Sequence, residues 1–157
     1  MAVEIERKFL VCNDYWKSEP HDSVILIRQG YLSTDTACAV RVRTANDAAY
    51  LTIKGKRQGL SCKEHEWPIP YSDALELLQM CSTPIITKTR HIIYHNSLKW
   101  EVDVFEGTHA GLVMAEVEFP NEDSTEISQL PVWIGREVSY DLRYTNVYIA
   151  AHGIPNT

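Results

Sequence analysis

Acidic and basic residues recur two positions apart in at least six segments of the sequence, and this spacing could gather them into one site. The acidic pairs are Glu4 with Glu6, Glu64 with Glu66, Glu101 with Asp103, and Glu116 with Glu118. The basic residues of the same segments are Lys8, Arg41, Arg43, Lys54, Lys56, Lys88 and Arg90. Carboxylates bind hard cations such as Mg²⁺ or Mn²⁺ through oxygen, whereas Arg and Lys bind phosphate oxygens. A complex of a metal with a polyphosphate needs both kinds of group at once.

An alternation of apolar and polar residues predicts that most of these charges lie on β-strands. Successive side chains of a strand point to opposite faces, so residues two apart share a face. The segments with this pattern are 3–9, 24–32, 39–43, 50–54, 63–67, 86–94, 99–105 and 112–119. About eight short strands in succession favour an antiparallel sheet that is closed or nearly so. The expected fold class is α+β and mostly β, with a few flanking helices.

Helical signals are confined to two stretches. Ser72 can cap a helix whose apolar side carries Leu75 and Leu78. A second helix is expected at 145–151, after a short extended piece at 137–139. Asn96-Ser97 has the composition of a hairpin turn between two of the strands.

Closing the sheet around its charged face would create a tunnel lined by both signs of charge. The apolar face would then point outward, where helices carrying Leu75, Leu78, Trp133 and Ile149 could cover it. For any single pair of charges, an ordinary solvated sheet face is the simpler interpretation. For the whole set it is weaker, because like charges side by side on a sheet cost stability, and such a cost usually persists at functional sites.

Composition limits the remaining function classes. The 157 residues have a mass of 17.9 kDa, which predicts one domain covering 1–157. The net charge of −6 argues against non-specific nucleic-acid binding. No apolar run approaches the ~20 residues of a membrane helix, and the N-terminal segment alternates charged with apolar residues. We therefore expect no membrane partner, no signal peptide and a cytoplasmic location. The four cysteines form no C-x-x-C pair and are expected to be free thiols.

Several of these segments resemble the CYTH family, also called the triphosphate tunnel metalloenzymes. Glu4-Ile5-Glu6-Arg7-Lys8 fits the E-x-E-x-K signature that opens the family. The later segments that look like the family are 29–32, 40–43, 51–55, 88–90, 100–105, 115–119, 134–138 and 143–146. The resemblance spans residues 3 to about 151 and implies an eight-stranded antiparallel tunnel with flanking helices.

The resemblance also implies roles for individual residues. The carboxylates expected to bind the metal are those of Glu4, Glu6, Glu116 and Glu118. The side chains expected to contact phosphate are Lys8, Arg41, Arg43, Lys54 and Arg90. The similarity to short bacterial members implies hydrolysis of inorganic triphosphate to pyrophosphate and phosphate. In those members a Tyr–Lys pair is proposed as the general base, which corresponds here to Tyr31 and Lys88. An ammonium beside a phenol favours the phenolate, which can take a proton from water.

Further hypotheses extend this assignment. A second metal could lie near Glu101 and Asp103 and orient the attacking water. Adenylate cyclases and thiamine or nucleoside triphosphatases are alternatives on the same scaffold, with another triphosphate as the substrate. A polyphosphate-binding module without turnover is a third reading, and the presence of both Tyr31 and Lys88 argues against it. Outward Trp and Tyr side chains are compatible with a homodimer.

The sequence departs from the family pattern at two positions of the fifth strand. Cys62 stands where relatives often carry Arg, and Pro68 stands where a further acid often follows. Both positions flank Glu64 and Glu66, so the roles of these two acids stay open.

Overall fold

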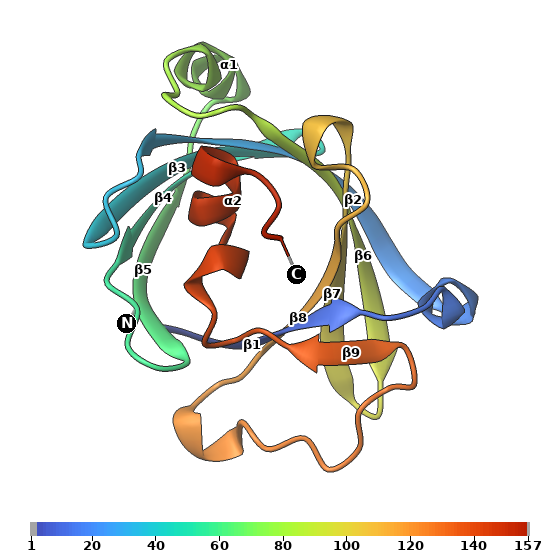
Figure 1. The fold of residues 1–157 in the computed structure, drawn as a ribbon. Coiled ribbons are helices and arrows are strands. Elements are labelled where there is room, and N and C mark those ends of the chain that lie inside the picture. Colours follow the sequence, from blue (N-terminus) through green and yellow to red (C-terminus); the bar gives the residue numbers. More distant parts are fainter. Residues whose placement is uncertain (1–2, 157) are drawn as a thin grey trace.

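Eight antiparallel strands close into a barrel because the first strand, β1, pairs with β8 on one side and with β5 on the other. The computed structural model describes residues 3–156. The strand order is β5-β4-β3-β2-β6-β7-β8-β1, and an additional pairing of β5 with β1 closes the ring (Figure 1). A ninth strand, β9, pairs with the last residues of β1. The mostly β, eight-stranded, closed barrel expected from the sequence is confirmed.

The expected strands are all present, and most extend past their predicted ends. The strands are β1 (Val3–Val11), β2 (His21–Ser33), β3 (Cys38–Ala45), β4 (Ala48–Gly55), β5 (Ser61–Pro68), β6 (Ile86–His95), β7 (Leu98–Phe105), β8 (Val113–Glu118) and β9 (Ile134–Glu137). The helices are α1 (Tyr71–Gln79) and α2 (Asn146–His152). The extended piece expected at 137–139 lies earlier in the chain, as β9. No helix within residues 3–156 is long and apolar enough to span a membrane.

The hairpin between β6 and β7 turns on Asn96 and Ser97, as predicted. Both residues have left-handed backbone, with φ of 49° and 64°. A tight two-residue turn of this kind matches the twist of the flanking strands and requires positive φ at both positions. The turn places Lys88 and Arg90 on β6 beside Asp103 on β7.

The register of the strands turns the charged residues inward. Lys8 lies opposite Glu116, and Glu6 lies opposite Glu118, across β1 and β8. Glu101 on β7 lies opposite Glu116 as well. Cross-strand partners point to the same face, so the charges of separate strands share the barrel interior.

The outer face of the barrel carries the largest apolar cluster. Phe9, Trp100, Val117 and Trp133 are almost completely buried there. Trp133 covers the sheet from an irregular segment and not from a helix, which corrects that part of the expectation. The inverted arrangement, with apolar residues outside and charges inside, is otherwise confirmed.

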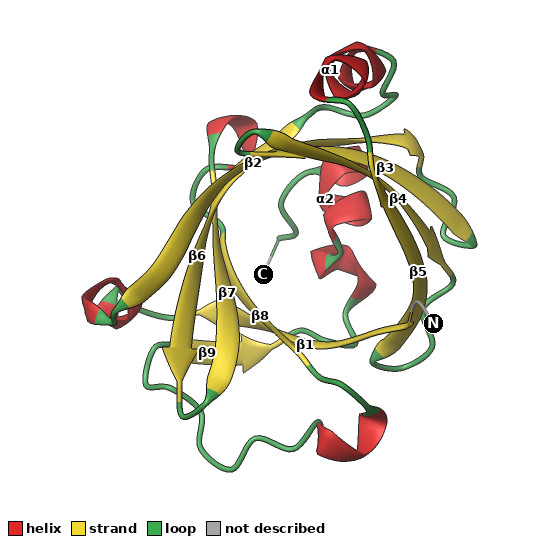
Figure 2. Cartoon of the chain, turned by 180° about the vertical axis from the view of Figure 1, so that it is seen from behind, coloured by secondary structure: helices red, strands yellow, loops and turns green. Residues whose placement is uncertain are grey.

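Helix α1 packs on the outside of β3 and β4, as Figure 2 shows. Its buried residues are Ala74 and Leu78, whereas Leu75 is 38% exposed. The helix begins at Tyr71 after Pro70, so Ser72 lies inside the first turn and does not cap it. The prediction for Ser72 was wrong because the helix begins before the expected cap. The prediction for Leu75 was wrong because Ala74 and Leu78 form the side of the helix that faces the sheet.

Helix α2 lies within the ring of strands and closes one end of it (Figures 1 and 2). Ile149 packs in a cluster with Tyr31, Ile86 and Phe105, whose side chains point into the barrel. The expectation that Ile149 covers the outer face was wrong. The interior residues at this end are apolar, so they offer Ile149 a buried surface that the charged part of the tunnel does not.

An exposed ion pair ties β9 to β1 and provides a first prediction. The Nε and Nη2 atoms of Arg7 each donate to a different oxygen of Glu137 at 2.8 Å. The hydrogen bond from Arg7 holds the pKa of Glu137 below its ordinary value. This stabilisation is present above the unfolded pKa of ~4.3 and is lost as pH falls through the lower folded value. Glu137→Gln should reduce the unfolding free energy at pH 7 by about 0.5–1 kcal/mol, a value already discounted for screening by water.

Urea unfolding of the wild type and of Glu137→Gln at pH 7 and pH 3 checks this prediction. The difference between the two proteins should shrink at pH 3. Glu126→Gln is a matched control, because Glu126 is exposed and makes no ion pair within residues 3–156. An equal difference at both pH values would show that the ion pair does not stabilise β9.

Candidate active site

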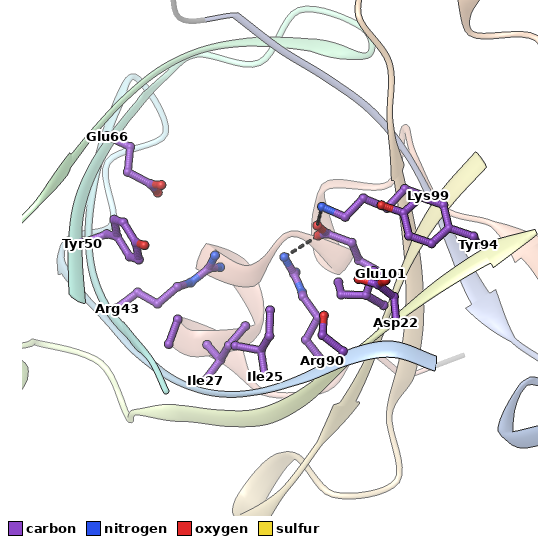
Figure 3. A pocket seen from close by; sticks show the side chains of 13 residues that line it. Asp22, Ile25, Ile27, Arg43, Tyr50, Glu66, Arg90, Tyr94, Lys99 and Glu101 are labelled. Atoms are coloured by element: carbon purple, nitrogen blue, oxygen red, sulfur yellow. Dashed lines mark ion pairs between the residues drawn. The ribbon is translucent and has the colours of Figure 1, made fainter. Parts of the chain in front are cut away.

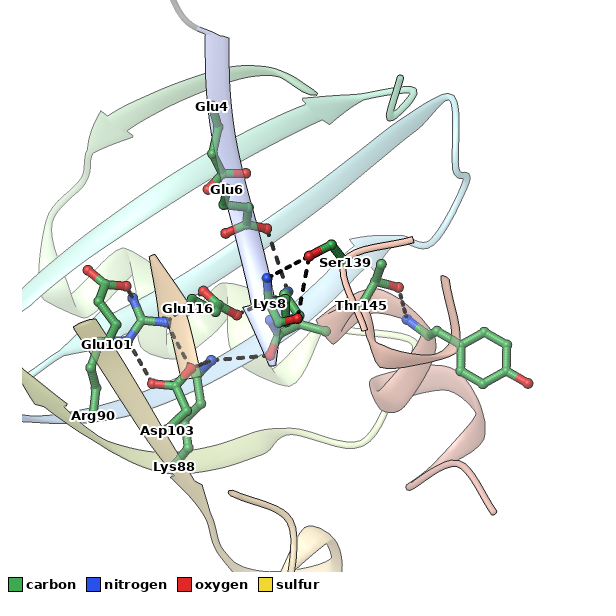
Figure 4. A network of polar contacts seen from close by, with 12 residues as sticks. Glu4, Glu6, Lys8, Lys88, Arg90, Glu101, Asp103, Glu116, Ser139 and Thr145 are labelled. Carbon is green, nitrogen blue, oxygen red and sulfur yellow. Dashed lines mark hydrogen bonds and ion pairs between the residues drawn. The ribbon is translucent and has the colours of Figure 1, made fainter. Parts of the chain in front are cut away.

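Inside the barrel, charged residues of separate strands join into groups of ion pairs, the largest of which connects β1, β6, β7 and β8 (Figure 4). Lys8 Nζ lies 3.0 Å from Glu116 Oε1 and 3.5 Å from Glu6 Oε1. Lys54 Nζ lies 2.6 Å from Glu4 Oε2. These contacts bring together metal and phosphate candidates from β1, β4 and β8.

The deepest part of the network lies between β6 and β7. Arg90 Nε donates to Asp103 Oδ1 at 2.7 Å, and Arg90 Nη2 donates to Oδ2 at 2.8 Å. Lys88 Nζ donates to the same Oδ2 at 2.6 Å. Lys88 and Asp103 are 0% and 1% exposed. Arg90 also forms an ion pair with Glu101. A metal at Asp103 would have to compete with both cations, and that assignment stays a prediction.

Burial and neighbouring charges act in opposite directions on this group. Burial lowers the pKa of Lys88 to about 8, although the charge of Asp103 opposes the shift. Burial alone would raise the pKa of Asp103, but the charges of Arg90 and Lys88 outweigh it and hold the pKa below its ordinary value. Asp103 therefore stays ionised and anchors both cations.

The wall formed by β3, separated from β6 only by β2, carries cations with few acidic partners. The Arg43 guanidinium donates twice to Gln29 Oε1, at 2.8 and 2.6 Å, and no carboxylate of residues 3–156 lies within ion-pair distance of it. Burial lowers the pKa of Arg43 to about 10, and the positive charge of Arg41 acts in the same direction. This wall therefore has a positive potential that would attract an anion.

Carboxylates are in excess around Glu118. Burial raises the pKa of Glu118, and the negative charges of Glu4, Glu101, Glu6 and Glu64 raise it further. No Lys, Arg or His of residues 3–156 lies within ion-pair distance of Glu118. Each of those four neighbours has a basic partner, so Glu118 is the one carboxylate of this group that has none within residues 3–156. Carboxylate oxygens are the ligands that a hard divalent cation prefers. The chemistry of these side chains therefore fits a divalent metal.

The carboxylates are not gathered around one point. Within residues 3–156, no three Asp, Glu, His or Cys side chains lie close enough together to hold a metal ion. Glu4, Glu6 and Glu116 each contact Lys or Arg instead. Metal binding by these residues would require them to exchange a basic partner for the cation.

A cavity of about 470 Å³ lies in the part of the tunnel away from α2. Figure 3 shows Arg43, Arg90 and Glu101 pointing into it from different strands. Its other lining residues include Ala45 and Tyr94, at the opposite ends of β3 and β6 from the residues that pack on α2. The charged interior is therefore reached from one mouth.

Tyr31 lies deeper, beneath α2. Its side chain is buried in the apolar cluster that includes Phe105 and Ile149. Lys88 Nζ lies 5.2 Å from the centre of the Phe105 ring. Within the described chain, no hydrogen bond joins Tyr31 to Lys88, which donates to Asp103 and Asn146 instead. Their joint action as the general base stays a prediction.

The structure adds Arg57 to the candidates predicted from the sequence. Arg57 Nη1 donates to Glu6 Oε1 at 3.2 Å from the connection between β4 and β5. Strand periodicity could not place it, since β4 ends at Gly55. The neighbouring Lys56, which we expected on the charged face if β4 continued, is exposed.

Neutral polar residues of the lining were also missed. Gln29 is fully buried and binds Arg43, while Thr52 Oγ1 donates to Glu66 at 2.8 Å. The alternation along β2 and β4 places both residues on the charged face, but neither carries a charge, so the pattern of charged residues did not reveal them.

The acids of β5 also pair with cations of the tunnel lining. Glu64 Oε2 lies 3.0 Å from Lys54 Nζ, and Glu66 Oε2 lies 3.5 Å from Arg41 Nη2. Cys62 is buried beside them, and burial raises the pKa of its thiol. All four cysteines are free, as expected.

A closed antiparallel β-tunnel lined by interleaved cations and carboxylates defines the class of protein. The CYTH domain family model matches residues 2–150. The chain therefore belongs to the CYTH domain family, which confirms the resemblance seen in the sequence.

Curated relatives and a solved structure agree with this assignment. A protein of Acetivibrio thermocellus named inorganic triphosphatase is 45% identical over 93% of this chain and 92% of its own. An inorganic triphosphatase of Nitrosomonas europaea is 36% identical over 94% of this chain and 97% of its own. The crystal structure of an inorganic triphosphatase is 34% identical, with a TM-score of 0.67, and the match covers 94% of this chain and 97% of that one.

Proposed function

We propose that this protein hydrolyses inorganic triphosphate to pyrophosphate and phosphate with the help of Mg²⁺ or Mn²⁺. The observation that carries the proposal is the division of charge inside the tunnel. Arg43 has no carboxylate partner within residues 3–156, and the carboxylates around Glu118 have an excess of negative charge. A metal–triphosphate complex complements both regions. The names of the relatives support inorganic triphosphate as the substrate.

The residues that we propose to bind phosphate oxygens are Lys8, Arg41, Arg43, Lys54 and Arg90. Those that we propose to hold the metal are Glu4, Glu6, Glu116 and Glu118. When bound, a divalent cation would offset negative charge on the phosphate oxygens. The lysine and arginine side chains stabilise the charge of the transferring phosphoryl group.

Exchange of partners explains how one network can serve both purposes. In the structure, Lys8 neutralises Glu116, and Lys54 neutralises Glu4. With a metal–triphosphate complex bound, Glu116 and Glu4 would hold the metal, and Lys8 and Lys54 would bind phosphate oxygens. Each buried charge would then keep an opposite partner, which limits the cost of desolvation.

Proton transfer is assigned to Tyr31 and Lys88. We propose that Tyr31 acts as a phenolate, stabilised by the positive charge of Lys88, and that its oxygen accepts a proton from the attacking water and becomes the neutral phenol. Burial opposes the charged form of each side chain, but it also means that water would screen the charge of Lys88 only weakly at the phenol.

The test is phosphate release from inorganic triphosphate, ATP and thiamine triphosphate, with and without Mg²⁺ or Mn²⁺. Metal-dependent release that strongly favours inorganic triphosphate is expected. Formation of cyclic AMP from ATP without phosphate release from inorganic triphosphate would instead identify an adenylate cyclase. Binding of triphosphate without any product would identify a binding module.

Arg57→Met provides a prediction for the residue that the sequence did not reveal. If Glu6 held a metal, the Arg57 guanidinium beside it would be available to bind a phosphate oxygen. Removing a charge-assisted hydrogen bond should raise KM for triphosphate about ten-fold, with a smaller change in kcat. Steady-state kinetics at saturating metal measure both constants.

Lys56→Met is the matched control, because Lys56 is adjacent in sequence and exposed. It should leave KM unchanged. If Arg57→Met has the KM of the wild type, Arg57 takes no part in substrate binding.

A further inference from the structure

Lys88 is held by residues from two separate elements. Its Nζ donates to Asp103 Oδ2 on β7 at 2.6 Å and to Asn146 Oδ1 at 3.1 Å. Asn146 is the first residue of α2, the helix that closes the end of the tunnel. The ring of Phe105 lies 5.2 Å from the same amine and offers no acceptor. Two acceptors therefore hold this fully buried ammonium.

Two acceptors fix the direction of a lysine side chain better than one. The lysine side chain has a flexible stem of four carbons, and its ammonium carries three equivalent N–H donors. With Asp103 alone, the amine could pivot around a single contact. The second acceptor removes this freedom and leaves the third N–H for another group in the tunnel.

Both acceptors are themselves held in place. Arg90 donates two hydrogen bonds to the Asp103 carboxylate. Asn146 lies at the start of a helix that Thr145 caps by accepting a hydrogen bond from the Tyr148 backbone N–H at 3.3 Å. Ile149, one turn further along, is fully buried. Helix α2 therefore holds the side-chain carbonyl of Asn146 in a fixed position beside Lys88.

We propose that Asn146 is a positioning residue, whose side-chain carbonyl orients the Lys88 amine for hydrolysis. In this view α2 completes the catalytic group in addition to closing the tunnel. The inference rests on the proposed function, because it concerns the step that Lys88 assists.

Asn146→Leu removes the acceptor and keeps a side chain of similar size. It should lower kcat for triphosphate about ten-fold and leave KM within about two-fold, because Asn146 orients the lysine without binding phosphate. Asn146→Asp keeps the oxygen acceptor and should retain a kcat close to that of the wild type. His152→Leu, at the exposed end of the same helix, should retain both constants.

A double-variant cycle separates positioning from general packing. In a Lys88→Met background, Asn146→Leu should cause no further loss of kcat, because the group that it orients is absent. Thermal unfolding of each variant reports whether α2 still packs. If Asn146→Leu does not fold, Asn146→Ala replaces it in the same cycle.

The outcomes distinguish this inference from the proposed function. A wild-type kcat in Asn146→Leu, or an equal loss with and without Lys88, would overturn the positioning role while leaving the hydrolase intact. Absence of phosphate release from the wild type would overturn the proposed function itself. A loss of kcat that depends on Lys88 and is rescued by Asn146→Asp would establish the role.

Discussion

Glu118→Gln should abolish metal-dependent phosphate release while leaving the protein at least as stable as the wild type. Loss of one proposed metal ligand should reduce turnover about 100-fold. Burial and neighbouring carboxylates raise the pKa of Glu118, so its charged form opposes folding at neutral pH. A neutral amide removes this repulsion. Because Glu118 is partly open to water, we expect a gain of only about 0.5 kcal/mol in unfolding free energy.

Glu116→Gln is the informative comparison for this prediction. Glu116 contacts Lys8 and Arg90, and although burial opposes its charge, these cations hold its pKa well below the ordinary value. Its carboxylate therefore contributes stability above the unfolded pKa, and that contribution is lost as pH falls through the lower folded value. Glu116→Gln should lose activity and stability together.

Metal-free thermal unfolding and phosphate release measure the two effects on each variant. Full activity in Glu118→Gln would show that this residue does not hold the metal. A marked loss of stability in the same variant would show that the negative potential around Glu118 is compensated by another group.

Asp103→Leu should cause the largest loss of stability. The substitution leaves Lys88 and Arg90 buried next to each other without their shared carboxylate. Removal of one partner from a buried ion pair typically costs 3–5 kcal/mol, and we expect a loss of at least about 3 kcal/mol at pH 7. The deficit should narrow between pH 7 and pH 9, because in the variant Lys88 can release its proton in the folded state more readily than in the unfolded chain.

Urea unfolding at both pH values checks this prediction. The double variant Asp103→Leu with Lys88→Met should recover part of the lost stability, because only one of the two buried cations then lacks the Asp103 carboxylate. Asp141→Asn is the control, since Asp141 pairs with Arg143 at the surface and should leave the urea midpoint nearly unchanged. If Asp103→Leu unfolds at the midpoint of the wild type, the buried network contributes little to folding.

The strands and the side of the barrel that each charge faces could be predicted because both follow from an alternation of period two. Glu101 and Asp103 on β7, or Glu116 on β8, occupy alternate positions, and the pleat alone sends them inward. The alternation did not predict that β2 pairs with β6, or that β1 pairs with β8 and β5, because these strands are far apart in the sequence. This local rule was sufficient for most of the tunnel lining.

Features that depend on tertiary packing could not be predicted in the same way. The apolar side of α2 identifies Ile149 as buried but does not state which surface covers it, and both faces of this barrel have apolar regions. Arg57 reaches Glu6 from a connection without periodicity. The contact of Asn146 with Lys88 joins residues far apart in the sequence through the position of α2.

Closure of one end by α2 has a consequence for the kinetics of a hydrolase of this shape. Substrate and both products must pass through the same mouth, because apolar side chains fill the opposite end. The product nearer the mouth must leave first, and the product formed at the inner end can leave only after it. Product departure is therefore ordered. The product that leaves last can rebind to the free enzyme and compete with triphosphate, whereas the product that leaves first cannot. The pattern of product inhibition therefore reveals whether phosphate or pyrophosphate forms at the inner end of the tunnel.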